Sequence, residues 1–391
     1  MTERERILAA IRGETPDRMP WVPRLEFWYR AKARNGTLPP GLRGLSLAEL
    51  ARKLGVGCYA VVPDFTDLAG DLDMVDYALG ILTQPTMVYE VTLEGVDRRV
   101  IRRGPETVVE YRTPLGRLRT TTVWTDEMLD GGASVPWVSE HAVKQPGDLE
   151  AAGYLFSHIK VTPRFDGYVR KRDEIAEDGI VVAHSSDFAG PMQHIMAALM
   201  PIEKFFYALH DDPSAVERLA EQMEPFYARI KDIAADSPAE TVMLGSNYDD
   251  AITYPAFFRK YILPPLRDYA VELHARGKYL MTHTDGENRK LLPLYVEAGF
   301  DVADSVCPHP MTSCTLEEVQ KAFAGRIAVW GGIASIMLCP GIVPEADFRA
   351  SIDALFERNH ASSRLILGVS DMVTADADLN RLHYITRLAT H

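Results

Sequence analysis

The stretch Lys278-Tyr-Leu-Met-Thr-His283-Thr-Asp285-Gly286-Glu287 contains a short apolar run that ends in a histidine, followed by an aspartate and a glycine. We interpret the run as a buried strand whose carboxyl end places an imidazole and a carboxylate in one loop. A helix signal follows at once over residues 288–298, and Gly299 ends it. In a fold built from βα repeats, such a corner is where chemistry takes place.

Extended stretches of this kind recur along the chain, and most are followed by a helix signal. Eight such units predict a (β/α)8 barrel of the TIM type, in the α/β class. A doubly wound sheet is the alternative, but no GxGxxG motif opens a helix after a strand. The eight extended stretches centre near residues 20, 58, 182, 243, 280, 304, 328 and 366.

The pattern changes between about residues 83 and 125, where apolar residues recur at close to period two. Gly95, Gly104 and Gly116 separate these runs. The pattern predicts an antiparallel β-excursion with hairpin turns, inserted near the N-terminus. A length of 391 residues suits one large barrel with an insertion, or two domains. We interpret residues 1–391 as a single barrel domain.

Composition and charge exclude several classes of protein. A net charge of -13 argues against nucleic-acid binding, for which a basic stripe is expected. No apolar run approaches the roughly 18 residues of a membrane span, and the charged N-terminus predicts an amphipathic helix, not a signal peptide. The four cysteines form no CxxC motif. We therefore expect a cytoplasmic enzyme.

In a barrel, the polar residues that end the strands share one mouth. Here they form an acidic set with a few imidazoles, which can bind a divalent metal or carry out acid–base chemistry. Structural roles are the alternative, because Asp and Asn after a strand often cap the next helix. The set comprises Asp64, His184, Ser186, Asp187, Asn247, Asp249, Asp250, His283, Asp285, Cys307, His309 and Asp371.

The order and spacing of short motifs over nearly the whole chain resemble the uroporphyrinogen decarboxylase superfamily. This resemblance implies a (β/α)8 barrel, and dimers are common in the superfamily, so we expect a homodimer. The motifs are Arg4-Glu-Arg-Ile-Leu-Ala-Ala-Ile-Arg-Gly-Glu-Thr-Pro-Asp-Arg18, Phe188-Ala-Gly-Pro191, Asp249-Asp250, Phe257-Phe-Arg-Lys-Tyr-Ile-Leu-Pro264, His283-Thr-Asp-Gly286, Glu297-Ala-Gly-Phe-Asp301, Trp330-Gly-Gly-Ile333 and Leu367-Gly368.

The resemblance distinguishes two branches. True uroporphyrinogen decarboxylases hold their substrate with an arginine-rich N-terminal loop and a buried aspartate. Here the expected Arg-Gln-Ala-Gly-Arg run is absent, although Arg24 and Arg30 remain, and Asp64 is a loose match to the aspartate. A substrate with many carboxylates would need the full cationic set. Decarboxylation of a smaller carboxylic acid stays open as the alternative function.

The chain also resembles a second branch, the corrinoid-dependent methyltransferases. In these proteins a zinc ion is held by a His-x-Cys pair and by a cysteine near the last strand. Here His283 is present, but Asp285 and Asp371 stand at the two cysteine positions. His with two carboxylates is a harder site, still suited to Zn²⁺ or another divalent cation. Cys307 is the alternative metal ligand. A centre without metal, acting as a general acid or only shaping a pocket, is the alternative.

We therefore expect a metal-assisted methyltransferase that moves a methyl group from a small O- or N-methyl compound to a corrinoid on a partner protein. The chain has no Asp-x-His-x-x-Gly cobalamin motif of its own. A barrel that binds its ligand without turnover is a third possibility. The expected catalytic residues are His283, Asp285, Asp250 and Asp371, and those expected to bind substrate are Arg24, Asp64, His184, Phe188, Asn247, Tyr248, Asp249 and Trp330.

Overall fold

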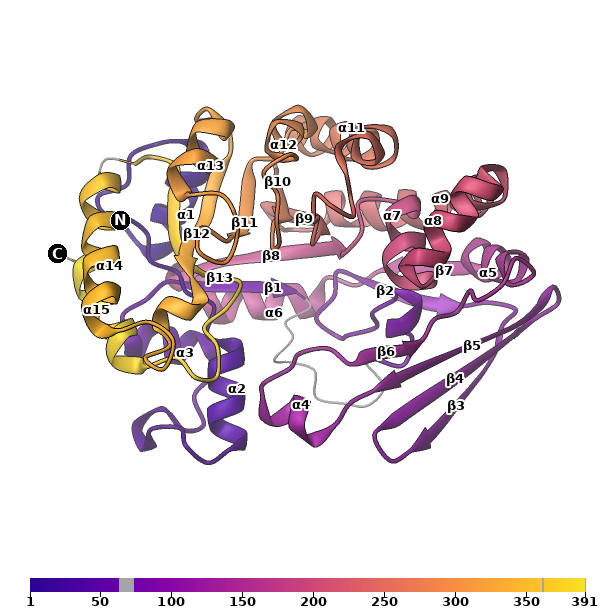
Figure 1. The fold of residues 1–391 in the computed structure, drawn as a ribbon, viewed down its shortest axis with the longest axis horizontal. Helices are drawn as coiled ribbons and strands as arrows, with labels where there is room; N and C mark the ends of the chain where they lie inside the picture. The colour runs from indigo at the N-terminus through magenta and orange to yellow at the C-terminus, as the bar shows by residue number, and fades with distance from the viewer. Residues whose placement is uncertain (63–73, 361, 391) are drawn as a thin grey trace.

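Seven parallel strands form the central sheet of the computed structural model, which describes residues 1–62, 74–360 and 362–390. Each strand pairs in parallel with its neighbour, so all carboxyl ends lie at one edge of the sheet. Figure 1 shows the sheet curling, with helices around it. In sheet order the strands are β1 (Cys58–Val62), β8 (Gly179–Ser186), β9 (Thr241–Ser246), β10 (Tyr279–His283), β11 (Val302–Val306), β12 (Ala328–Ala334) and β13 (Leu365–Ser370).

The eighth barrel position is filled by the irregular segment around Trp21. Trp21 forms a parallel bridge with Leu367 of β13, and the Gly57 amide, next to β1, donates to the Trp21 carbonyl at 2.8 Å. The segment therefore lies between the first and last strands of the sheet. Its prolines lack the N–H groups that a regular strand would use, which explains why only a bridge forms. The prediction of a TIM-type barrel is confirmed: seven of the eight expected stretches are strands, and the one near residue 20 forms only the bridge.

Buried apolar side chains from alternate strand positions fill the barrel. Tyr59 and Val61 of β1 point inward with Ile180 and Val182 of β8, as period-two alternation requires. The helix α1 (Glu3–Arg12) adds Ile7, Leu8 and Ile11 to the same cluster. This helix packs beside residues 176–178, just before β8 begins. Thus α1 closes the amino end of the barrel, and the opposite end carries the polar residues.

Helices cover the outside of the sheet, and a second apolar cluster lies between the two layers. No helix in the described ranges is both long and apolar enough to cross a bilayer. The helices are α1, α2 (Glu26–Arg34), α3 (Leu47–Leu54), α4 (Asp126–Asp130), α5 (Asp148–Ser157), α6 (Asp166–Ile175), α7 (Pro191–His194), α8 (Ile202–Asp211), α9 (Pro213–Asp236), α10 (Pro255–Phe257), α11 (Leu263–Ala275), α12 (Leu292–Ala298), α13 (Leu316–Phe323), α14 (Glu345–Asn359) and α15 (Leu379–Thr390). Short 3-10 or π segments are η1 (Pro40–Leu42), η2 (Tyr77–Leu79), η3 (Ala176–Asp178), η4 (Ile195–Leu199), η5 (Phe258–Ile262) and η6 (Ser335–Leu338).

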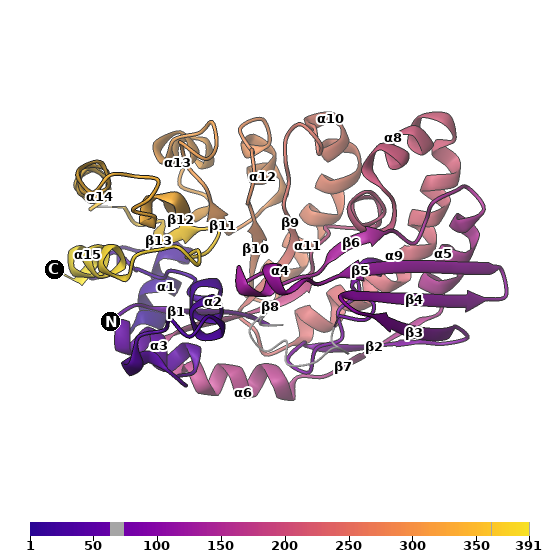
Figure 2. The same ribbon diagram turned by 60° about the horizontal axis from the view of Figure 1, so that its bottom comes forward.

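The predicted antiparallel excursion near the N-terminus is present between β1 and β8. Four strands form one sheet in the order β3-β4-β5-β6, and two others form a separate pair. Figure 2 shows β3, β4 and β5 extending away from the barrel. Residues 137–139 of β6 line a cavity together with residues at the ends of β8 and β9. Its strands are β2 (Tyr89–Leu93), β3 (Asp97–Arg103), β4 (Glu106–Thr113), β5 (Gly116–Val123), β6 (Trp137–Glu140) and β7 (Ile159–Pro163).

Candidate functional site

His283 is the last residue of β10, and the parallel pairing with β11 places Asp304 beside it. The His283 Nδ1 lies 2.9 Å from Asp304 Oδ2, and the Tyr59 hydroxyl donates to the same oxygen at 3.2 Å. The buried carboxylate therefore accepts the proton of Nδ1, which leaves Nε2 as the reactive nitrogen of the ring. A carboxylate in this position fixes both the tautomer and the orientation of a metal-binding or acid–base histidine.

Asp371, directly after β13, faces the other nitrogen of the same imidazole. Its Oδ1 lies 3.4 Å from His283 Nε2. The same oxygen accepts from Arg24 Nη1 at 2.9 Å and from Ser305 Oγ at 3.0 Å. Arg24 is only 8% exposed, and it follows the Trp21 segment that closes the barrel. The carboxyl ends of β10 and β13 and the closing segment thus meet at one point.

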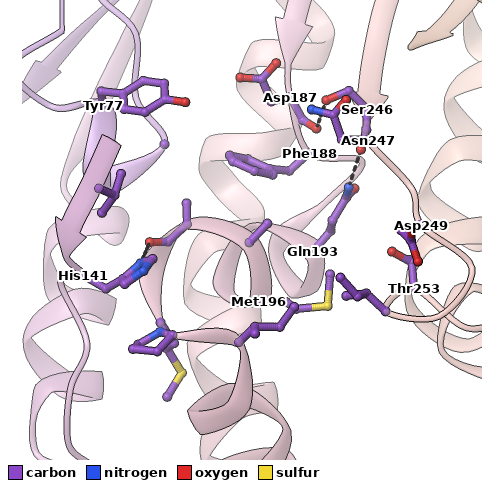
Figure 3. A pocket seen from close by; sticks show the side chains of 18 of the residues that line it. Tyr77, His141, Asp187, Phe188, Gln193, Met196, Ser246, Asn247, Asp249 and Thr253 are labelled. Carbon is purple, nitrogen blue, oxygen red and sulfur yellow. Dashed lines mark hydrogen bonds between the residues drawn. The ribbon is translucent and has the colours of Figure 1, made fainter. Parts of the chain in front are cut away.

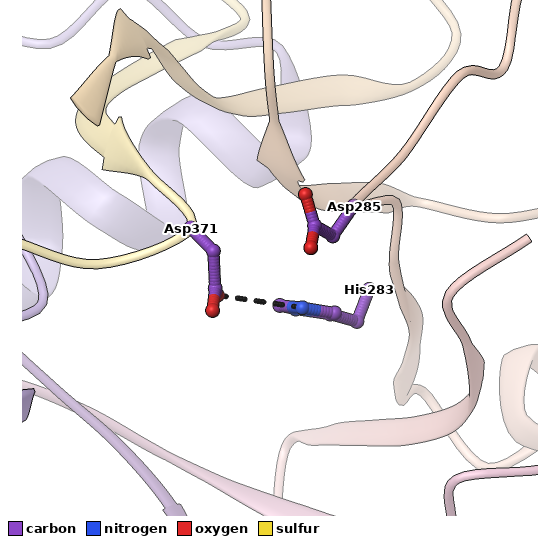
Figure 4. Close-up of side chains that lie close together, drawn as sticks. All are labelled: His283, Asp285 and Asp371. Carbon is purple, nitrogen blue, oxygen red and sulfur yellow. Dashed lines mark ion pairs between the residues drawn. The ribbon is translucent and has the colours of Figure 1, made fainter. Parts of the chain in front are cut away.

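Asp285 completes a group of three possible ligands. The nearest ligand atoms of His283, Asp285 and Asp371 all lie within 4.8 Å of one another, and Figure 4 shows the three side chains converging. Asp285 Oδ1 also accepts from the Gly286 amide at 2.9 Å. Gly286 has a φ of 100°, which side chains rarely adopt, so a glycine is required for this turn.

The charges of the group act on each other. Burial lowers the pKa of His283, but the charge of Asp371 and the hydrogen bond with Asp304 outweigh burial and raise it overall. Burial and the charge of Asp371 raise the pKa of Asp285. Burial opposes the ionisation of Asp371, yet Arg24 and His283 hold its pKa below the usual range. The group therefore combines an ionised carboxylate with a basic imidazole, which is a suitable setting for proton transfer.

The donor set also fits a hard divalent cation. One imidazole nitrogen, oriented through its other nitrogen, together with two carboxylates is a common ligand arrangement for Zn²⁺ and its neighbours. The reserve ligand Cys307 is not part of the group of three. Burial and the charges of Asp285 and Asp371 raise the pKa of Cys307 to about 12, so its thiolate form is disfavoured.

Several predicted substrate-binding residues lie beside the centre, around a cavity of about 790 Å³. Phe188, Asn247 and Asp249 line it after β8 and β9 (Figure 3). The Asn247 amide donates to the His283 carbonyl at 3.1 Å, so this wall adjoins β10. His184 lies behind it, buried, with Nε2 3.1 Å from Asp187 Oδ1.

Other predicted site residues are not part of the group of three. Tyr248 is fully buried against Phe258. Trp330 is inside the barrel, where it packs on Tyr59 with ring centroids 4.4 Å apart. Asp250 is buried and binds the Lys290 amide and Nζ, both at 2.9 Å, so it joins two loops. Asp64 lies outside the described residues.

Three residues that contact the centre were missed from the sequence: Asp304, Ser305 and Tyr59. Asp304 had a detectable signal, because a carboxylate within the apolar strand Val302-Ala-Asp-Ser-Val306 is costly to bury without a partner. Tyr59 had none, because a tyrosine in a strand usually contributes to the core. Asp187 stood among the strand-end residues but without a specific role. It lines the cavity, and although burial opposes its ionisation, His184 and then His283 lower its pKa.

The fold and site define an α/β barrel with an ionisable centre at the carboxyl ends of its strands. A family model described as uroporphyrinogen decarboxylase (URO-D) matches residues 186–390. This is more than half of the chain, and the chain belongs to that family. Among solved structures, a methyltransferase from Methanosarcina mazei is similar, with a TM-score of 0.52 and 14% identity over 100% of this chain and 98% of the other. That similarity is one of fold. No curated protein matches the chain.

Proposed function

We propose that the protein is a methyltransferase that moves a methyl group from a small O- or N-methyl compound to the corrinoid of a partner protein. The observation that carries the proposal is the convergence of His283 Nε2 with the carboxylates of Asp285 and Asp371. Family membership and the fold shared with a methyltransferase support it. We further propose a homodimer that works in the cytoplasm.

In the centre without metal, His283 would hold a proton at Nε2 for the heteroatom that loses its methyl group. In the metal-bound centre Nε2 would be a ligand and would carry no proton. The bond between the methyl carbon and the heteroatom breaks, and its electron pair stays on the heteroatom, which takes the proton. The corrinoid of the partner protein would supply the electron pair of the new bond to carbon. Asp304 keeps the imidazole oriented through Nδ1, and the carboxylate of Asp371 stabilises the charged ring.

His283, Asp285 and Asp371 would hold a divalent metal ion, for which we propose Zn²⁺. When bound, the metal would supply Lewis-acid polarisation of the heteroatom. Arg24 Nη1 already pairs with Asp371 Oδ1, so the charge of this carboxylate is balanced with or without the metal. Cys307 is the substitute ligand that the same experiments test.

Decarboxylation of a small carboxylic acid is the second candidate, favoured by one observation. The Nε of Arg24 is buried and has no hydrogen-bond partner among the described residues, so this guanidinium has a donor left for a substrate carboxylate. The Nη1 of Arg24 is already engaged by Asp371. This candidate therefore requires Arg24 to serve two carboxylates at once.

One set of assays separates the candidates. The metal content of the purified protein is measured first, and methyl transfer to cob(I)alamin is then followed with a panel of O- and N-methyl donors. We expect bound metal and formation of methylcobalamin. A protein with no metal and no transfer from any donor contradicts the proposal, and CO₂ release from a carboxylate panel supports the alternative.

The His283→Ala variant should lose metal while remaining folded. If His283→Ala keeps the metal and Cys307→Ala loses it, the metal site includes Cys307 and not His283.

A further inference from the structure

The carboxylates that line the cavity beside the His283 centre give its wall a negative charge. Three carboxylates line it, those of Asp187, Asp249 and the exposed Glu203 at its rim. No lysine or arginine is among the described residues that line it. The Asp249 Oδ1 accepts from the Ala251 amide at 2.9 Å, so this side chain is fixed by the turn. A ligand in the cavity therefore meets negative charge that no lysine or arginine of the described wall offsets.

Aromatic rings supply the other part of the wall. Tyr77, Trp137 and Phe188 line the cavity, and Figure 3 places Tyr77 and Asp249 at opposite sides of it. Phe188 lines the cavity and is held by stacking on His194, with ring centroids 4.4 Å apart. Burial lowers the pKa of His194 to about 4, and the ring behind Phe188 is therefore neutral at pH 7.

The cavity is next to the group formed by His283, Asp285 and Asp371. Ser246 lies opposite His283 in the pairing of β9 with β10, and the Asn247 amide donates to the His283 carbonyl. Both residues line the cavity. A volume of about 790 Å³ is ample for a small organic molecule that reaches from the aromatic wall toward β10.

We propose that this cavity binds an organic cation, so that the methyl donor of the reaction carries a positive charge. Aromatic faces and carboxylates together are the features that recognise alkylammonium groups. A carboxylate ligand would face three acids and no cation in the described wall. The role of the ligand as methyl donor rests on the proposed function, whereas the binding of a cation rests on the cavity alone.

Binding is tested with a charged probe and its neutral isostere on the full chain. Isothermal titration calorimetry compares (3-hydroxyphenyl)trimethylammonium with 3-tert-butylphenol, which have the same shape and differ in charge. We expect the cation to bind at least about tenfold more tightly, as a cation over aromatic rings beside carboxylates should. Equal or tighter binding of the neutral probe, or no binding of the cation, overturns the inference.

A charge-removing variant tests the wall itself. Asp249→Asn keeps an oxygen for the Ala251 amide, so the turn survives while the charge is lost. We expect it to weaken cation binding about fivefold or more and to leave the neutral probe unchanged. Asp268→Asn is the control, because it removes one charge from an exposed position on α11 and should change neither affinity. Unchanged cation affinity in folded Asp249→Asn protein contradicts the inference.

The two proposals fail in different ways. Cation binding without methyl transfer from any donor leaves this inference standing and contradicts the proposed function. Methyl transfer from neutral donors by a protein that does not bind the cation contradicts this inference and leaves the function standing.

Discussion

Asp304 Oδ2 lies 2.9 Å from His283 Nδ1, because the pairing of β10 with β11 sets the two residues side by side. The imidazole therefore presents Nε2 to Asp371 and Asp285. The orientation of the reactive nitrogen is thus set by a buried strand residue and not by a flexible loop.

Replacing Asp304 should weaken metal binding without removing a ligand. We expect Asp304→Asn to lower the affinity for Zn²⁺ by about 10- to 100-fold, the usual effect of losing the partner of a metal-binding histidine. Titration with a competing zinc indicator measures it. The matched control is Asp301→Asn, which alters a similar pair with His274, 2.8 Å apart and on the outside of the barrel. Equal zinc affinities in the wild type and Asp304→Asn would contradict the orienting role.

Arg24 should matter most when no metal is bound. Arg24→Met removes the guanidinium that pairs with the carboxylate of Asp371, and such a loss costs roughly 3 kcal/mol of unfolding free energy. Saturating Zn²⁺ should raise the melting temperature of this variant more than that of the wild type, because the metal replaces the missing charge. In Arg24→Met/Asp371→Asn, the destabilisation should be smaller than in the single variant. An equal zinc effect on the variant and the wild type would argue against a shared site.

Asp250 was predicted to be catalytic, but its contacts with Lys290 support a structural role. Asp250→Asn should lower the unfolding free energy by about 1 kcal/mol, the usual size of one such hydrogen bond, and keep the zinc affinity. Asp285→Asn, by contrast, should reduce zinc affinity. Both are measured by chemical denaturation and zinc titration. A loss of metal in Asp250→Asn equal to that in Asp285→Asn would restore a direct role for Asp250.

His194 should make stability depend on pH. The buried ring accepts from the Tyr227 hydroxyl at 2.9 Å and donates to the Leu79 carbonyl at 2.7 Å, and burial lowers its pKa to about 4. The unfolded chain binds this proton below about pH 6.5. Between these values the unfolded state holds more protons, so stability is full above pH 6.5 and falls as the pH falls toward 4.

The slope of unfolding free energy against pH measures this effect. His194 should contribute up to about 1.4 kcal/mol per pH unit between pH 6.5 and 4. His194→Gln, which cannot titrate, should show a slope smaller by this amount, whatever its own stability. Parallel slopes for the two proteins would contradict a neutral buried imidazole.

The barrel was predictable from the sequence because each strand is a short buried apolar run that ends in polar residues. His283, Asp285 and Asp371 were found because they directly follow strands, where side chains meet at the barrel mouth. Their role is still a proposal. Asp304 and Tyr59 were not found, because their part depends on which residues of neighbouring strands stand opposite each other. That register is set by tertiary packing and is not visible in one strand alone.

Tyr248 and Trp330 illustrate the same limit. Both follow or end apolar runs, yet the side chain of Tyr248 packs into an aromatic cluster and that of Trp330 points into the barrel. Alternation along a strand assigns one face to the core, but the identity of that face depends on the pairing. The cavity beside β8 and β9 was equally hidden, because β6 of the distant excursion contributes to its wall.

The most direct test of the central claim is the initial rate of methyl transfer to cob(I)alamin at saturating Zn²⁺, compared between the wild type and His283→Ala. The account predicts measurable transfer by the wild type and a rate at least about 100-fold lower in the folded variant, as expected when an acid–base or metal-binding group is lost. Equal rates in the two proteins would contradict it, because the chemistry would then lie away from His283.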